Sequence, residues 1–244
     1  MDINENSTVG EITASNYHFA TVFSKYAIDF CCNGNRSIKA VCEEINLNPS
    51  ELIQDLNTIV SDSSGAQHTP DYNAWSLDML TNYIEKKHHQ YIIEHTPLLQ
   101  QHLIKINTVH GANHPEITAI QKLFISISDE LTIHMKKEEL MLFPYIGRMV
   151  SAKEEGTTLV QPLFGKVEYP IQVMMAEHDQ EGEKFRKIAS LSNGFQAPAD
   201  ACNTYRATYA MLKEFEEDLH LHIHLENNIL FPKAAALELD VLKN

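Results

Sequence analysis

The sequence lacks several features that would place it at or beyond a membrane. It contains no apolar run near the roughly 20 residues that a helix needs to cross a bilayer. Its first residues, MDINENSTVGEITAS, contain neither a basic start nor an apolar stretch, so we do not expect a cleaved secretory signal. The four cysteines are too few and too unevenly spaced for a disulfide scaffold. These absences predict a cytoplasmic protein with reduced thiols and no membrane partner.

Positive charge is also scarce. The chain has 19 Lys and Arg against 33 Asp and Glu, which gives a formal net charge of -14. Such a field repels phosphate backbones and anionic lipid, so we expect no nucleic-acid partner. The same negative field attracts cations. The 13 histidines point in the same direction, because neutral imidazole is the commonest metal ligand among side chains.

Strand-like alternation is almost missing, so the fold class we predict is all-α. Four long helical stretches are expected in residues 74–244, and we predict that they form an antiparallel four-helix bundle. They cover about 75–107 (with Pro97 expected to kink or break the helix), 114–149, 169–193, and 198 to beyond 232. Residues 154–168 form a loop between the hairpins that is long for its place, and we attach no function to it.

A polar segment separates this region from the start of the chain. Residues 61–73 contain Gly and Pro without an apolar period, which is typical of a linker. Upstream, Ser37 can cap one helix, and Asn48-Pro49-Ser50-Glu51 has the pattern of another helix start. We therefore predict a small helical domain in residues 1–60.

An internal repeat carries the functional argument. The segments HMKKEELMLFP (residues 134–144) and HIHLENNILFP (residues 222–232) share the His, the Glu four residues later, and Leu-Phe-Pro. Upstream of them, His88 precedes His134 by 134 − 88 = 46 residues, and His178 precedes His222 by 222 − 178 = 44. The chain therefore has the pattern of two similar helix hairpins.

The spacing of the repeat predicts a metal centre. Residues at i and i+4 lie on one helical face, so the His and the Glu of each copy can bind the same ion. With one imidazole from each first helix, the ligand set is His88, His134, Glu138, His178, His222 and Glu226. Four imidazoles and two carboxylates suit a pair of iron ions, bridged by carboxylate or oxo groups, better than calcium or magnesium. Manganese and zinc remain open on affinity grounds.

Other residues near the repeat have weaker patterns. His89 and several further histidines lack repeat partners, and we expect them to be structural or solvated. A ferritin-like Glu-x-x-His site is the second choice, because Glu85 with His88 and Glu217 with His220 fit it only at non-equivalent places. Glu130 and Glu177 lie close to ligand histidines in sequence. Each could orient an imidazole, line an ion path or be a solvated glutamate.

The adjacent Cys31 and Cys32 precede an Asn-Gly turn. They could be buried bystanders, or an exposed thiol pair that takes up metal or nitric oxide or forms disulfides. Together with the bundle motifs, this segment (Asp29-Phe30-Cys31-Cys32-Asn33-Gly34) resembles the repair-of-iron-centres proteins, hemerythrin-like di-iron proteins of bacteria. The resemblance spans nearly the whole chain. It implies the same six iron ligands and a link to iron–sulfur clusters damaged by oxidative or nitrosative stress.

Three functions follow as hypotheses. The first is repair, in which the centre supplies iron to damaged iron–sulfur proteins or removes nitric oxide, and the cysteine pair assists. The second is an enzyme of small-molecule redox chemistry, such as nitric oxide reduction. The third is oxygen binding as in hemerythrins, which have five imidazole ligands against four here. The attached cysteine domain favours the first two. The client protein, the physiological reductant and the oligomeric state remain open.

Overall fold

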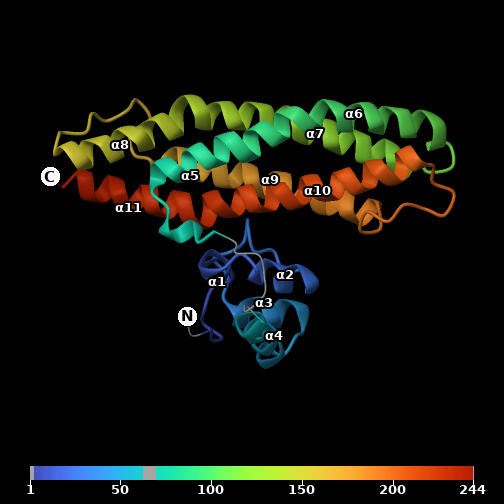
Figure 1. Cartoon of the computed structure of the whole chain (residues 1–244), viewed down its shortest axis with the longest axis horizontal. Coiled ribbons are helices and arrows are strands. Elements are labelled where there is room, and N and C mark those ends of the chain that lie inside the picture. The colour runs from blue at the N-terminus through green and yellow to red at the C-terminus, as the bar shows by residue number, and fades with distance from the viewer. Residues whose placement is uncertain (1–2, 63–69, 244) are drawn as a thin grey trace.

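The structure is a computed structural model that describes residues 3–62 and 70–243 (Figure 1). Within these two ranges most of the chain is helical, and the only β-type pairing is an isolated antiparallel bridge between Thr8 and Ser37. The all-α fold class predicted from the sequence is therefore confirmed.

The N-terminal domain packs four short helices around a small apolar core. Local signals define their starts. Thr8 and Glu11 form a reciprocal capping box at the first helix, and the Ser37 hydroxyl accepts from the Ala40 N–H at the third. Phe23 and other apolar side chains of this domain are fully buried in the folded chain. The helices are α1 (Val9–Ser15), α2 (Phe19–Lys25), α3 (Ile38–Ile45) and α4 (Pro49–Asp62).

The predicted linker is shorter than the sequence pattern indicated. Helix α4 continues to Asp62, so residues 61–62 are helical. Residues 63–69 lie outside the described part of the chain. After them, a 3-10 turn, η1 (Tyr72–Ala74), leads into the bundle.

The bundle has four long arms that run up and down the molecule (Figure 1). The helix pairs α6 with α7, α7 with α9, α9 with α10, and α10 with α6 are in contact, which closes the bundle around one core. Pro97 lies inside α6 without ending it. The arms are α5 (Leu77–Tyr83), η2 (Ile84–His89) and α6 (Gln90–His110); α7 (Glu116–Lys137), η3 (Glu138–Leu142) and α8 (Phe143–Glu155); α9 (Glu168–Leu191); and α10 (Asn203–Leu225), η4 (Glu226–Leu230) and α11 (Phe231–Val241).

Two predicted helix boundaries differ from the structure. The second arm continues to Glu155, six residues beyond the expected end, and stops where Gly156 adopts a left-handed conformation (φ 65°). The fourth arm begins at Asn203 and not at Pro198, because Ala201 N–H donates to the Pro198 carbonyl in a turn and Cys202 takes the N-cap position.

Three of the four arms contain a π-helical turn, η2, η3 and η4, in which the hydrogen bond spans one residue more than in an α-helix. Each extra residue rotates the side chains that follow it around the helix axis. Such turns occur frequently at functional sites. All three lie at residues of the predicted metal centre.

The N-terminal domain lies against the middle of the bundle, beside α10 (Figure 1). Its Tyr17 and Phe30 rings pack near His224 and His220, with centroid separations of 5.5 and 5.8 Å. Burial without a partner charge lowers the pKa of His224 to about 3, so it is neutral in this interface. The buried apolar residues of this domain and of the α6, α7, α9 and α10 region form one continuous cluster. The domain is therefore fixed to the bundle by a shared core.

The long loop between α8 and α9 is tied down by a buried carboxylate. Glu238 is 4% exposed and accepts from Tyr145 Oη (2.7 Å) and from the Val167 N–H (2.8 Å). We expect Glu238→Ala to lower the free energy of unfolding by about 2–4 kcal/mol, because two buried donors lose their acceptor. Thermal or urea unfolding measures this loss. Glu238→Gln keeps one acceptor oxygen and is expected to lose less; an equal loss in both variants would contradict the assignment.

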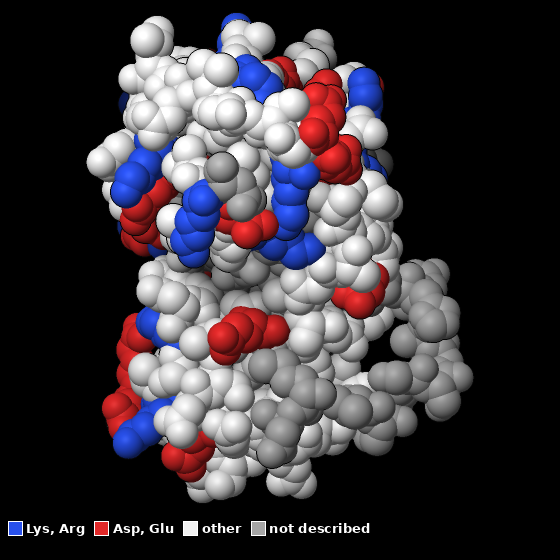
Figure 2. All heavy atoms as spheres, turned by 90° about the vertical axis from the view of Figure 1, so that its left-hand side faces the viewer, with Lys and Arg blue, Asp and Glu red and all other residues white. Residues whose placement is uncertain are grey.

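Charges of both signs mix on the surface. On the end of the molecule that carries α8 and α11, Lys and Arg lie among Asp and Glu (Figure 2), as in the Lys153–Asp240 pair at 2.9 Å. This face shows no continuous basic area in its described part. Across residues 3–62 and 70–243, none of the helices has both the length and the apolar content needed to cross a membrane.

Candidate metal centre

Two groups of buried side chains meet in the bundle interior, and they share both carboxylates. Each residue contributes one ligand atom, and within each group these atoms lie within 4.8 Å of one another. All of the residues are at most 1% exposed. The first group is His134, His178, Glu138 and Glu226, and the second is His89, His222, Glu138 and Glu226.

Each carboxylate faces both groups with a different oxygen. Glu138 Oε1 lies 3.4 Å from His134 Nε2, and Glu138 Oε2 lies 3.3 Å from His89 Nε2. Glu226 repeats the pattern, with Oε1 3.2 Å from His222 Nε2 and Oε2 3.1 Å from His178 Nε2. The arrangement has the pseudo-two-fold symmetry that the sequence repeat predicts. It offers two neighbouring positions with two imidazoles and two carboxylate oxygens each.

The electrostatics favour ionised carboxylates. Burial alone would raise the pKa of Glu138 and of Glu226. The facing imidazoles outweigh this effect, and the pKa of Glu226 falls well below its ordinary value while that of Glu138 is also lowered. Two negative charges in a buried site need cations. The donor set, imidazole nitrogen with carboxylate oxygen, therefore fits transition-metal ions such as iron.

The structure places His89 in the cluster where the sequence analysis placed His88. His88 is also buried, but its Nδ1 lies 3.0 Å from Asp218 Oδ2. The reason is the π-helical turn η2, which ends at His89 and shifts the inward face of the arm by one residue. A signal was present in the sequence. His89 precedes His134 by 134 − 89 = 45 residues, closer than His88 to the 44 residues that separate His178 from His222.

Outer hydrogen bonds orient three of the four imidazoles. The Nδ1–H of His134 donates to Glu177 Oε2 over 2.8 Å, so this predicted residue does lie against a ligand histidine. His89 Nδ1 lies 2.7 Å from Glu139 Oε1, and His178 Nδ1 lies 2.8 Å from Asn227 Oδ1. Each bond leaves Nε2 free to face the centre.

Sequence reasoning missed Glu139 and Asn227. The repeat could have identified both, because each directly follows the glutamate of its copy. Their places are thus equivalent in the two hairpins, but one is a carboxylate and the other an amide.

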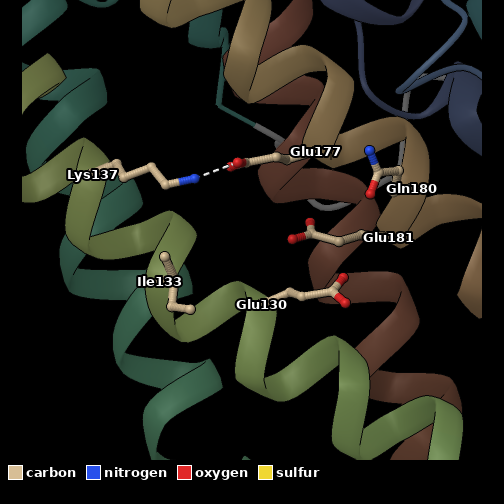
Figure 3. Close-up of a pocket in the computed structure, with 6 residues that line it drawn as sticks. All are labelled: Glu130, Ile133, Lys137, Glu177, Gln180 and Glu181. Atoms are coloured by element: carbon tan, nitrogen blue, oxygen red, sulfur yellow. Dashed lines mark hydrogen bonds and ion pairs between the residues drawn. The ribbon is translucent and has the colours of Figure 1, made fainter.

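A pocket of about 220 Å³ opens on the α7–α9 side of the centre (Figure 3). It is lined by Glu130, Ile133, Lys137, Glu177, Gln180 and Glu181. Glu130 forms an ion pair with Lys184 and does not contact a ligand histidine in the described contacts. Glu177 bonds Lys137 as well as His134, and chiefly the bond to His134 lowers its pKa to about 2.

Glu181 is the carboxylate in this pocket that sequence reasoning did not find. It is 1% exposed, and neither of its oxygens has a hydrogen-bond partner among the described residues. In Figure 3 it lies between Glu177 and Glu130 and extends into the open space. Burial raises its pKa to about 7 despite the nearby His134 and His178.

The raised pKa gives a pH-dependent prediction. In the unfolded chain Glu181 ionises near its ordinary pKa of 4.5, but in the metal-free fold it stays neutral until about pH 7. Its presence therefore lowers stability as the pH rises from 4.5 to 7, by up to about 3 kcal/mol above that range. We expect Glu181→Gln to stabilise the metal-free protein by about 3 kcal/mol at pH 8 and about 1 kcal/mol at pH 5. Urea unfolding at both pH values measures this; an equal gain at both would contradict it.

The predicted thiol pair lies beside the centre. Cys31 is 3% exposed and Cys32 is half-buried, so the pair is neither fully exposed nor fully buried. Their sulfur atoms lie 3.8 Å apart, and Cys32 Sγ lies 3.4 Å from the His178 carbonyl oxygen. Asp29 Oδ1 accepts from both backbone N–H groups, at 3.1 and 2.9 Å, and thereby forms the turn. The bond to Cys32, then burial, raises the pKa of the Cys31 thiol.

Comparisons with known proteins agree with this geometry. The model of the hemerythrin HHE cation binding domain matches residues 81–234, which is more than half of the chain. The chain belongs to the hemerythrin HHE family. Every residue of the two buried groups lies inside the matched range of this hemerythrin domain, and so does the pocket with Glu181. Residues 5–60 match a domain of unknown function, DUF542, which covers the N-terminal domain with the cysteine turn.

Similar proteins match this chain over nearly its whole length. The chain is 31% identical over 229 residues to the iron-sulfur cluster repair protein YtfE of Yersinia pseudotuberculosis serotype IB (strain PB1/+). It has the same identity over the same length to the protein of that name from Yersinia pestis (strain Pestoides F). Each match covers 94% of this chain and 96% of the relative. The resemblance to the repair-of-iron-centres proteins is therefore confirmed.

Proposed function

We propose that this protein repairs iron–sulfur clusters damaged by oxidative or nitrosative stress, using a di-iron centre in its hemerythrin domain. The observation that supports this most strongly is the pair of buried groups that share both carboxylates. One metal ion would need only one of these groups of ligands. Two groups with bridging glutamates fit two ions held side by side. The relatives named for iron–sulfur cluster repair, similar over 94% of this chain, support the cellular role.

We assign one iron to His134 and His178 and the other to His89 and His222. Glu138 and Glu226 face both histidine pairs with separate oxygens and would hold both ions. Bound iron supplies redox chemistry and exchangeable metal. The protein supplies the geometry: bonds to Glu177, Glu139 and Asn227 hold three imidazoles with Nε2 inward, and burial excludes water.

The pocket on the α7–α9 side lies next to this centre, because Glu177 on its wall bonds His134, and we propose it as the route for iron or nitric oxide. Its carboxylates, Glu130, Glu177 and Glu181, suit a cation in transit, and Lys137 pairs with one of them. Glu177 thus has two parts in the proposal: it orients His134 and it lines the passage.

A transfer experiment tests the proposal. The protein is loaded with isotopically labelled ferrous iron and mixed anaerobically with a purified [4Fe–4S] protein whose cluster has been nitrosylated. We expect the client to regain activity and to contain labelled iron. Recovery without label would replace iron supply by nitric oxide removal. No recovery beyond that given by free ferrous iron would refute repair by this chain.

The structure bears differently on the two other hypotheses, oxygen binding and nitric oxide reduction. Four imidazoles face the centre, one fewer than the five imidazole ligands of oxygen-carrying hemerythrins, so the ligand set does not favour oxygen carriage. Nitric oxide reduction needs the same two iron positions as repair. Nitrous oxide formed by the iron-loaded protein alone, without a client, would support it.

A further inference from the structure

One ligand of the proposed centre, His178, is linked to the turn that carries Cys31 and Cys32 (the cysteine turn) through a single side chain. The side-chain amide of Asn227 uses both of its ends. Its Oδ1 accepts from His178 Nδ1 at 2.8 Å, and its Nδ2 donates to the Cys31 carbonyl oxygen at 3.2 Å. Asn227 is 7% exposed, so water does not compete freely for these bonds. A second contact closes the connection, because Cys32 Sγ lies 3.4 Å from the His178 carbonyl oxygen.

Metal binding fixes which atoms donate and which accept along these hydrogen bonds. When His178 binds a metal through Nε2, its proton must be on Nδ1, and that proton is donated to Asn227 Oδ1. The amide is then oriented, and its N–H group faces the Cys31 carbonyl. Without a metal, no metal bond at Nε2 fixes the imidazole ring of His178. The hydrogen bond to Asn227 is then less constrained, and one anchor of the turn is weaker.

Besides the burial of Phe30 and Cys31 in the shared core, few polar contacts hold the turn on the bundle. The neighbouring Asn228 donates from Nδ2 to the Phe30 carbonyl at 3.1 Å, and Arg186 binds Asp29 at 3.0 Å. The backbone comes unusually close here. A Cβ added to Gly34 would lie 2.5 Å from Asn228 Oδ1, so only glycine allows this approach. The turn thus lies close against η4, the element that contains Asn227.

The first hairpin has no equivalent of the link that Asn227 forms. Glu139 occupies the place equivalent to Asn227 and bonds His89 at 2.7 Å. A carboxylate can only accept, so it orients the imidazole and passes no donor onward. An amide both accepts and donates. In the second hairpin, Asn227 can therefore link His178 to a neighbouring backbone carbonyl, which is that of Cys31.

We propose that Asn227 is a positioning residue that makes the accessibility of Cys32 depend on metal at His178. With iron bound, the bridge holds the turn closed over Cys32. With iron gone, the turn opens and the thiol becomes available, at the moment when an ion has left the centre. This inference rests on the proposed di-iron site and adds regulation of the thiol pair by its occupancy.

The test compares thiol alkylation in iron-loaded and metal-free full-length protein. Samples react anaerobically with iodoacetamide, and peptide mass spectrometry follows Cys32. The exposed Cys202, at the start of α10, serves as an internal control for reagent and handling. We expect iron to slow alkylation of Cys32 about fivefold, the factor that one net hydrogen bond supplies, and to leave the Cys202 rate unchanged.

Asn227→Asp is the decisive variant, because Asp keeps an acceptor for His178 and loses the donor to Cys31. We expect iron to be retained and Cys32 to react at the same rate with and without it. Glu139→Gln is the matched change at the equivalent place beside His89; there the iron dependence of Cys32 should persist. Unchanged protection in Asn227→Asp, or a Cys32 rate indifferent to iron in the unaltered protein, would overturn the inference.

Linkage adds a measurement that does not depend on the variant. If iron favours the closed turn and the carbamidomethyl group on Cys32 keeps the turn open, alkylated protein binds iron more weakly. We expect a chelator to remove iron more completely from alkylated than from untreated protein. Equal removal would overturn the inference. An unaltered protein that binds no iron would instead refute the proposed centre, so the two failures are distinguishable.

Discussion

Glu138→Gln and Glu226→Gln are each expected to reduce bound iron from about two ions per chain to nearly none. Each carboxylate faces both groups, so one substitution removes a ligand from both positions. Loss of a direct ligand should cost at least the roughly 10–100-fold in affinity that loss of an outer hydrogen-bond partner costs. Glutamine has the size of glutamate and removes a buried charge, so the fold should persist. Metal analysis after anaerobic reconstitution, with circular dichroism for folding, measures the result.

Histidine variants provide the contrast. His89→Gln removes a ligand from one group only, and we expect about one iron to remain. The matched control is His88→Gln, whose amide can still donate to Asp218 in place of the imidazole. It should keep about two ions. The reverse outcome, iron lost with His88 and kept with His89, would contradict the arrangement of η2. Two irons in Glu138→Gln would contradict bridging by carboxylates.

Replacing Cys31 and Cys32 together with Ser is expected to leave iron content unchanged and to abolish repair of a nitrosylated cluster protein. Neither cysteine belongs to the two buried groups at the centre. A serine hydroxyl is not ionised at neutral pH and is a poor nucleophile beside a thiolate, so a thiol-dependent step should slow by tenfold or more, as an order of magnitude. The measurement is the recovery rate of client activity at equal iron loading.

Cys202→Ser is the control for this variant. Cys202 is exposed at the start of α10, where serine is itself a favoured cap, and repair should continue at the normal rate. A double Cys31/Cys32 variant that repairs at the normal rate would make these thiols bystanders. The bundle alone would then have to carry the function.

The two hairpins of the repeat differ at the residue that follows the glutamate ligand, so their ligand histidines have different neighbours. Both copies of the repeat contain the same His and Glu. The residue after that Glu is the charged Glu139 in the first copy and the amide Asn227 in the second. That difference directs one half toward the surface and the other toward the N-terminal domain. A duplicated metal site can thus acquire regulation on one side while its ligand geometry stays symmetric.

The sequence by itself determined the helical class, the bundle and the symmetric ligand pattern. An i, i+4 pair lies on one face of any α-helix, so His134 with Glu138 and His222 with Glu226 follow from local geometry alone. The two copies also fix the symmetry. Cap signals such as Ser37 located helix starts, because a cap is a contact between neighbours in sequence.

Only the tertiary structure decided between His88 and His89. A π-helical turn has no strong local signal in the sequence; it forms where packing around the centre favours one extra residue, and it moved the inward face by one position. Glu181 and Asn227 also needed the fold. The burial of one carboxylate and the contact of an amide with a carbonyl 196 residues away depend on which helices lie side by side. Such long-range neighbours are set by packing of the whole bundle against the N-terminal domain, not by spacing along the chain.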